Sequence, residues 1–116
     1  MPKHFRIPAR EIKPVATGFG SCIASDRITV DGIKVGYLYR EPPDNSLDSG
    51  WRFFAGDESQ EYSSDPNNFA LYDVNTIANY DPMIVVLLET PAPCAFERDP
   101  SLDCWVVAPP PGSPGG

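Results

Sequence analysis

Fourteen prolines and nine glycines are spread along a chain of 116 residues, and they restrict the fold more than any other feature of the sequence. Proline is excluded from helix interiors and central strands, and glycine is a usual residue of tight turns. We therefore expect many turns between short helices and strands, and no long helix. The length fits one ordinary domain, and the 41% hydrophobic and 22% charged residues are typical of a globular chain.

The two ends of the chain differ in composition from the middle. Residues 1–18 combine basic side chains and three prolines with few large apolar residues, which predicts a loosely ordered arm whose charge could fold back on an acidic body. Residues 109–116, PPPGSPGG, lack the apolar side chains that a core needs. We therefore expect a single α+β domain over residues 19–108, with a mainly antiparallel sheet and a few short helices.

The first half of this domain has the patterns of strands. An apolar stretch over residues 19–25 predicts one strand, and Asp31-Gly32 predicts a hairpin turn between apolar residues on either side. Alternation from residue 35 to residue 40 predicts a half-buried strand with Tyr37 and Tyr39 on the same side.

A loop and an aromatic strand are expected next. Residues 41–50, EPPDNSLDSG, hold two prolines and three acids and predict an exposed loop. Residues 50–55 are aromatic and predict a strand in which Trp51 and Phe53 share one face, with Arg52 and Phe54 on the other.

The second half mixes short helices with strands. Asp57 is expected to cap a short helix, residues 65–68 to turn the chain, and Val74, Ile77 and Ala78 to lie on one side of another helix. After Pro82 the pattern allows either a helix or a strand. Further strands are expected at residues 69–72, 95–97 and 104–107. The polar residues expected to cap helices and turn the chain here are Asp73, Asn75, Asn79 and Asp81.

Negative charge is concentrated outside the arm. Residues 1–13 hold four of the nine basic residues and one of the sixteen acidic ones, so the remainder carries five bases against fifteen acids. A body with this charge repels nucleic acid and anionic lipid, and its long-range field speeds encounter with basic partners.

The three cysteines and the N-terminus indicate a protein of the cytoplasm. Cys22, Cys94 and Cys104 are odd in number and contain no C-x-x-C pair, so the sequence predicts neither a disulfide framework nor a zinc knuckle. The N-terminus has no apolar leader, and the aliphatic run at residues 83–88 is too short to cross a bilayer. We expect a soluble cytoplasmic protein.

Motifs for catalysis are missing from the sequence. The one histidine, His4, lies in the expected arm, where it is not held as a general base needs to be. No glycine-rich phosphate loop and no EF-hand loop is present. A magnesium site built from Asp57 and Glu61 stays open as an alternative, as does a solvated helix start for the same acids.

Residues 36–98 carry a particular combination of motifs. Its most specific parts are Gly-Trp-Arg-Phe-Phe at 50–54 and Asn-Thr-Ile-Ala-Asn-Tyr at 75–80. The remaining matches are Gly36-Tyr37, Tyr39-Arg40-Glu41, Pro43-Asp44-Asn45, Asp48-Ser49, Gly56-Asp57-Glu58, Asp65-Pro66, Tyr72-Asp73-Val74, Asp81-Pro82 and Ala95-Phe96-Glu97-Arg98. This pattern resembles immunity protein 33 of bacterial polymorphic toxin systems, a family formerly labelled as of unknown function, over residues 20–99. The resemblance implies a small intracellular α+β protein that neutralises a toxin and brings no catalytic residues.

The resemblance and the charge together suggest a function. We expect an immunity protein, not an enzyme, that binds and occludes a toxin through an acidic, aromatic-containing surface formed by residues 41–50 and 57–65. The expected partner is a protein with a basic surface, a homodimer is left open, and no cofactor or metal, nucleic acid or membrane is expected. The candidate partner-binding residues are Glu41, Asp44, Asp48, Trp51, Asp57, Glu58, Glu61, Tyr62 and Asp65. The alternatives are a structural or regulatory interaction module without a toxin, and a metal-dependent enzyme that uses the clustered carboxylates.

Overall fold

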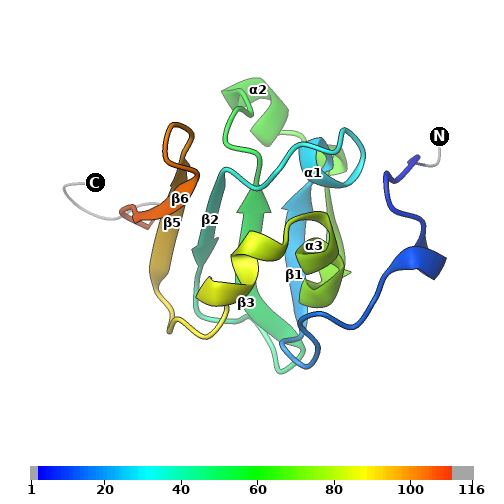
Figure 1. The fold of residues 1–116 in the computed structure, drawn as a ribbon, viewed down its shortest axis with the longest axis horizontal. Helices are drawn as coiled ribbons and strands as arrows, with labels where there is room; N and C mark the ends of the chain where they lie inside the picture. The colour runs from blue at the N-terminus through cyan, green and yellow to red at the C-terminus, as the bar shows by residue number, and fades with distance from the viewer. Residues whose placement is uncertain (1–2, 111–116) are drawn as a thin grey trace.

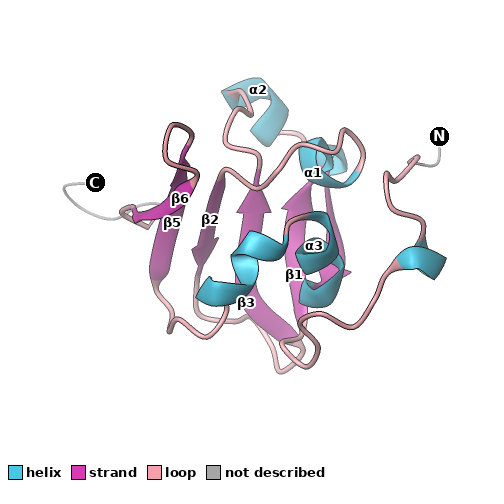
Figure 2. Ribbon diagram, in the orientation of Figure 1, coloured by secondary structure: helices cyan, strands magenta, loops and turns pink. Residues whose placement is uncertain are grey.

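The structure, a computed structural model, describes residues 3–110. A six-stranded sheet with the strand order β4-β1-β3-β2-β5-β6 forms its centre (Figures 1 and 2). The strands are β1 (Ser21–Ser25), β2 (Tyr37–Arg40), β3 (Asp48–Phe54), β4 (Phe69–Asp73), β5 (Cys94–Asp99) and β6 (Cys104–Val107). The helices are α1 (Asp26–Thr29), α2 (Gln60–Ser63) and α3 (Val74–Tyr80), and the 3₁₀ helices are η1 (Ala9–Glu11), η2 (Pro66–Asn68) and η3 (Pro82–Leu87).

Neighbouring strands of the sheet are antiparallel, except for β1 and β3, which are parallel. Strand β3 lies between β1 and β2 in the sheet and runs antiparallel to β2. The expectation of one α+β domain with a mainly antiparallel sheet and a few short helices is therefore confirmed. Its boundaries at residues 18 and 108 stay a prediction, and most of the expected tail lies outside the described residues.

One face of the sheet is covered by helices. Figure 1 shows α3 and η3 lying in front of the sheet. Leu38 and Phe53 are direct partners in β2 and β3 and point to this covered face, where both are fully buried. The helices contribute the buried side chains of Ile77 and Ile84 to the same core. We call the opposite face of the sheet the open face, because no helix of the described residues lies across its centre.

The expected hairpin at Asp31-Gly32 is wrong. Residues 26–29 form α1 instead, because the side chain of Ser25 caps the helix by accepting a hydrogen bond from the backbone N–H of Arg27. Gly32 has a φ of +78° and donates its N–H to the carbonyl of Ile28. A glycine with positive φ ends a helix as readily as it forms a hairpin turn, so the dipeptide alone does not separate the two structures.

Two other expectations need correction in the middle of the chain. Strand β3 begins at Asp48, inside the segment expected to be a loop. Helix α2 is capped by Ser59, whose side chain accepts from the N–H of Tyr62, so Asp57 is not the cap. After Pro82 the chain forms the 3₁₀ helix η3, which settles the choice between helix and strand.

The polar residues around α3 have two different roles. Asp73 caps α3 and Asp81 caps η3, as expected. Asn75 and Asn79 do not cap their helix; their side-chain amides both donate to the carbonyl of Lys13 at 2.9 Å. These bonds fix the N-terminal segment along α3, and the 2.8 Å ion pair between Lys3 and Asp26 shows basic charge folding back on the acidic body.

Replacing the cap of α3 is expected to destabilise the fold. Asp73 accepts a 2.9 Å hydrogen bond from the N–H of Asn75, and Asp73→Ala leaves that N–H without its partner. We expect the free energy of unfolding to fall by about 1 kcal/mol, while Asp73→Asn, which can still cap, keeps most of it. Urea unfolding measures both values, and equal losses in the two variants would contradict this role.

Candidate functional site

A connected row of half-exposed aromatic side chains crosses the open face. Its members, which we call the aromatic strip, are Tyr37, Tyr39, Phe54, Tyr62 and Phe69. The rings of Tyr39 and Phe54 stack with their centroids 5.8 Å apart, and Phe69 joins Phe54 edge-on at 5.7 Å. Side chains alternate between the faces of a strand, so Phe54 points away from the core that buries Phe53. The strip is therefore an aromatic surface in contact with solvent.

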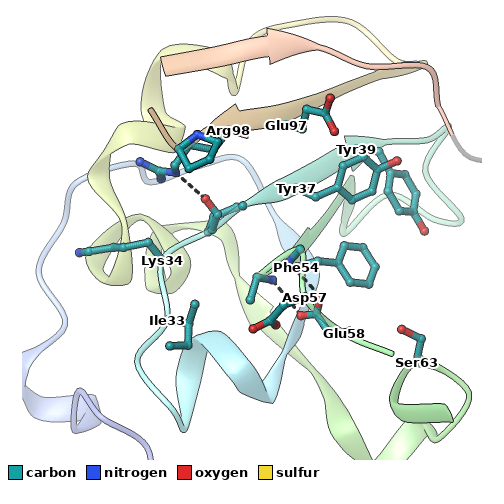
Figure 3. A pocket seen from close by; sticks show the side chains of 15 residues that line it. Ile33, Lys34, Tyr37, Tyr39, Phe54, Asp57, Glu58, Ser63, Glu97 and Arg98 are labelled. Atoms are coloured by element: carbon teal, nitrogen blue, oxygen red, sulfur yellow. Dashed lines mark hydrogen bonds between the residues drawn. The ribbon is translucent and has the colours of Figure 1, made fainter. Parts of the chain in front are cut away.

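Hollows lie on both sides of the strip. An open groove of about 820 Å³ is lined by Tyr37, Tyr39 and Phe54 together with Glu58 and Glu97 (Figure 3). A smaller hollow of about 340 Å³ lies past Phe69 and is lined by apolar residues that include Ile23 and Leu71. Leu71 is 72% exposed. The open face is therefore apolar and aromatic across several strands.

An ion-pair group lies at the N-terminal end of β3. It consists of Arg52 with the carboxylates of Glu41, Asp44 and Asp48, and we call it the Arg52 cluster. The guanidinium of Arg52 donates to both carboxylate oxygens of Asp48 at 2.9 Å and to Glu41 at 2.8 Å. Asp44 lies 4.0 Å from it and has a side chain that is 85% exposed.

Asp48 is a structural member of this cluster. Its side chain is only 9% exposed and also accepts the backbone N–H groups of Asp44 and Gly50 at 3.0 Å. The hydrogen bonds from Arg52 hold the pKa of the Asp48 carboxyl well below its ordinary range, although burial acts in the opposite direction. Asp44 and Glu41 are more exposed and remain open to contact from outside.

The low pKa of Asp48 predicts a loss of stability in acid. A carboxyl whose pKa is lower in the folded than in the unfolded state stabilises the fold fully above its unfolded pKa of about 3.9. That contribution is lost as the pH falls from this value toward the folded pKa. We expect the free energy of unfolding to drop below about pH 4, and to drop less in Asp48→Asn, which is already weaker at pH 7. Urea titrations from pH 7 to pH 2.5 test this, and parallel curves for the two proteins would contradict it.

The second acidic group lies at the other end of β3. Asp57 binds Arg27 with bonds of 2.6 and 3.2 Å, and these bonds lower the pKa of its carboxyl. Glu58 accepts the backbone N–H groups of Ala55 and Gly56. Asp65 caps η2, while Glu61 is exposed in the first turn of α2. Asp57, Glu58 and Asp65 therefore hold the local fold as well as carrying charge.

The two acidic segments do not form one continuous patch. Strand β3 has seven residues, so its ends lie about 20 Å apart. The aromatic strip lies between the two groups on the open face. The expected acidic surface is thus divided into two charged ends with an aromatic centre.

Trp51 does not belong to this surface, so its expected place among the partner-binding residues is wrong. Its side chain is fully buried on the covered face, and its indole N–H donates to the carbonyl of Leu88 at 3.2 Å. The alternation of β3 was predicted correctly, but the face that the helices cover was not. Tyr62, the other aromatic candidate for partner binding, is half-buried in the strip, with its ring edge-on to Phe69.

Tyr37, Tyr39, Phe54 and Phe69 were not predicted as surface residues. The detectable signal was the alternation that placed Tyr37 and Tyr39 together on one side of their strand. Aromatic residues are usually core residues, so composition favoured the core for all of them. Pairing of β2 with β3 brings Tyr37 and Tyr39 of β2 beside Phe54 of β3, so the aromatic residues of the two strands form one surface.

The side chains that could take part in catalysis or bind a metal lie in different parts of the chain. Burial raises the pKa of the Cys22 thiol strongly, which keeps it protonated and a poor nucleophile. His4 is exposed and lies in the N-terminal segment. Within residues 3–110 no three His, Cys, Asp or Glu side chains are grouped as metal ligands would be. None of the helices in this range has the length and apolar character to cross a membrane.

A family model described as the Immunity protein Imm33 domain matches residues 22–107. No curated protein and no solved structure matched the chain. The matched segment contains the aromatic strip, the Arg52 cluster and the second acidic group.

Proposed function

This chain belongs to the Imm33 family of immunity proteins, and we propose that it neutralises a bacterial toxin by binding it through the open face of its sheet. The mechanism is occlusion: the aromatic strip contacts the toxin at the centre, and the acidic groups at both ends of β3 pair with basic residues of the toxin. The chain then acts as a binding protein and needs no catalytic group.

The observation that carries this proposal is the arrangement of the open face. Stable interfaces have an apolar, aromatic-rich centre and a charged rim, and they bury about 800 Å² on each partner. The aromatic strip supplies such a centre, and Leu71 extends it toward β4. The length of β3, about 20 Å, suits the width of an interface of this size.

The charge of the chain supports a basic partner. The formal net charge is −7, and the basic residues Arg27 and Arg52 are held in ion pairs on the folded body. The more exposed carboxylates at the ends of β3 include Asp44 and Glu61. A negative field of this kind speeds the encounter with a cationic surface and is weakened by salt.

Rescue of growth tests the function directly. Each candidate toxin encoded next to this gene in the native host is expressed in a test bacterium with and without this chain. The proposal expects one of these toxins to arrest growth, this chain to restore it, and the two purified proteins to form a complex. A toxin that is neutralised without any complex would exclude occlusion, and neutralisation of none of the neighbouring toxins would leave the interaction-module alternative.

The exposed carboxylates at the two ends of β3, which we call the rim, are expected to control the rate of association with the toxin. Asp44→Lys with Glu61→Lys reverses charge at the two ends of β3 without touching Asp48, Asp57 or Glu58, which hold the fold. We expect the association rate constant to fall about tenfold at low salt and its salt dependence to weaken.

The matched control places the same charge change elsewhere. Glu11→Lys with Glu89→Lys alters exposed residues of η1 and of the segment after η3, outside the open face. Stopped-flow measurements with the toxin compare the two double variants. Equal rate constants for them would show that only net charge matters and would remove the rim from the proposal.

A further inference from the structure

We propose that the groove beside the aromatic strip receives an arginine side chain of the toxin. The inference rests on the proposed function for the identity of the partner, but the groove can be tested without it. The groove is open and about 820 Å³ in volume, which leaves room for a side chain together with part of the loop that carries it.

The base of the groove is built from aromatic faces and bare backbone. Tyr37, Tyr39 and Phe54 form a connected group with ring centroids between 5.8 and 6.0 Å apart. Gly36 lies beside them, and a Cβ atom on it would come within 2.0 Å of the carbonyl oxygen of Ala55. Gly36 therefore lines the groove with backbone and adds no side chain beside the rings. A planar cation stacks favourably on such faces.

The charge that faces this groove is mainly negative. Glu97 is exposed on β5 and is the direct strand partner of Tyr37, so its side chain stands on the open face beside that ring. Glu58 lines the opposite wall together with Asp57, whose carboxylate is paired with Arg27 (Figure 3). Guanidinium combines stacking on an aromatic ring with paired hydrogen bonds to a carboxylate, and this groove offers both.

The two cations that also line the groove are already engaged. Lys34 donates from its ammonium group to the carbonyl of Tyr80 at 3.0 Å. Arg98 donates to the carbonyl of Val35 at 2.9 Å and pairs with Asp81 and Asp103. Both side chains are therefore held by partners toward the covered side or the β5–β6 turn, and they leave the carboxylate of Glu97 to meet an incoming cation. An anionic ligand would meet Glu97 and Glu58 and is disfavoured.

NMR titration of the whole chain tests the groove. The probes are Nα-acetyl-arginine N-methylamide and its neutral isostere, Nα-acetyl-citrulline N-methylamide. We expect saturable shifts from the arginine probe at Gly36, Tyr37, Ala55, Gly56 and Glu97, and binding at least about fivefold weaker from the citrulline probe. Equal binding of the two probes, or shifts centred on other residues, would overturn the proposal.

Substitution of one exposed residue provides a second test of the groove. Glu97→Gln keeps the shape of the side chain and removes its charge, and we expect it to weaken binding of the arginine probe about threefold. Glu89→Gln, on an exposed residue outside the groove, is the matched control and should leave binding unchanged. If the groove fails these titrations while growth rescue succeeds, the groove proposal is wrong and the proposed function stands. If the titrations succeed and no toxin is neutralised, the groove binds arginine, but the proposed function fails and so does the toxin as the source of that arginine.

Discussion

Arg52→Ala is expected to lower the free energy of unfolding by about 3–5 kcal/mol, the largest loss that we expect from one surface-adjacent residue. Arg52 has a side chain only 5% exposed, and it holds the nearly buried carboxylate of Asp48 with two bonds of 2.9 Å. Its removal leaves that carboxylate in a poorly solvated site without its charged partner. Urea unfolding at pH 7 measures the loss.

A double substitution of Arg52 and Asp48 distinguishes the effect of an unpaired buried charge from the effect of lost packing. Arg52→Met with Asp48→Asn removes both charges and keeps similar volumes. Asn can still accept one of the two N–H groups that Asp48 binds, because these groups bond to different carboxylate oxygens. We expect this double variant to lose less than half as much stability as Arg52→Ala, because no uncompensated charge remains buried. A loss of under 1 kcal/mol for Arg52→Ala would show that the Arg52 cluster contributes little to folding.

Truncation of the aromatic strip is expected to have the largest effect on binding. Tyr39→Ala with Phe54→Ala removes the stacked pair of the aromatic strip, in which both rings are half-exposed. Central aromatic residues of an interface commonly cost 2 kcal/mol or more when truncated, so we expect the affinity for the toxin to fall at least about 30-fold. Isothermal titration calorimetry with the purified toxin measures this change.

Two controls accompany this substitution. Tyr39→Phe with Phe54→Tyr keeps both rings and should retain affinity within a few fold. Val86→Ala removes an apolar side chain that is 80% exposed on η3, on the covered side of the sheet, and should have no effect. Thermal unfolding of each variant shows whether enough of it is folded for the comparison. Full affinity in a folded Ala double variant would place the interface elsewhere.

The sequence predicted those elements whose pattern is local. Strand β2 and helix α3 have the expected periods, and β4 lies where a strand was expected. Helix α3 is capped by Asp73, one of the residues expected to cap or turn the chain. Helix α1 was missed because four residues make little more than one helical turn, which is too short to show a repeating pattern. A glycine with positive φ also serves both a helix end and a hairpin turn. Short elements are therefore decided by caps and tertiary contacts rather than by periodicity.

The candidate site depended on information that local patterns do not contain. Alternation separated Trp51 from Arg52 correctly, but which face α3 and η3 cover depends on how the chain returns to the sheet. The acidic segments are near each other in sequence, with β3 between them, and an extended strand separates its two ends by its full length. Strand pairing also brings Phe54 beside Tyr39 from a distant position. The aromatic strip could be recognised only after these pairings were known.

The most direct test of the central claim is side-chain footprinting of the complex with the toxin. Hydroxyl radicals label exposed aromatic and aliphatic side chains in the free chain and in the complex, and mass spectrometry reads the labelling at each residue. The account predicts that labelling of Tyr39, Tyr62 and Leu71 falls in the complex, while labelling of Val86 on η3 is unchanged. Protection of Val86 with unchanged labelling of those three residues would contradict it.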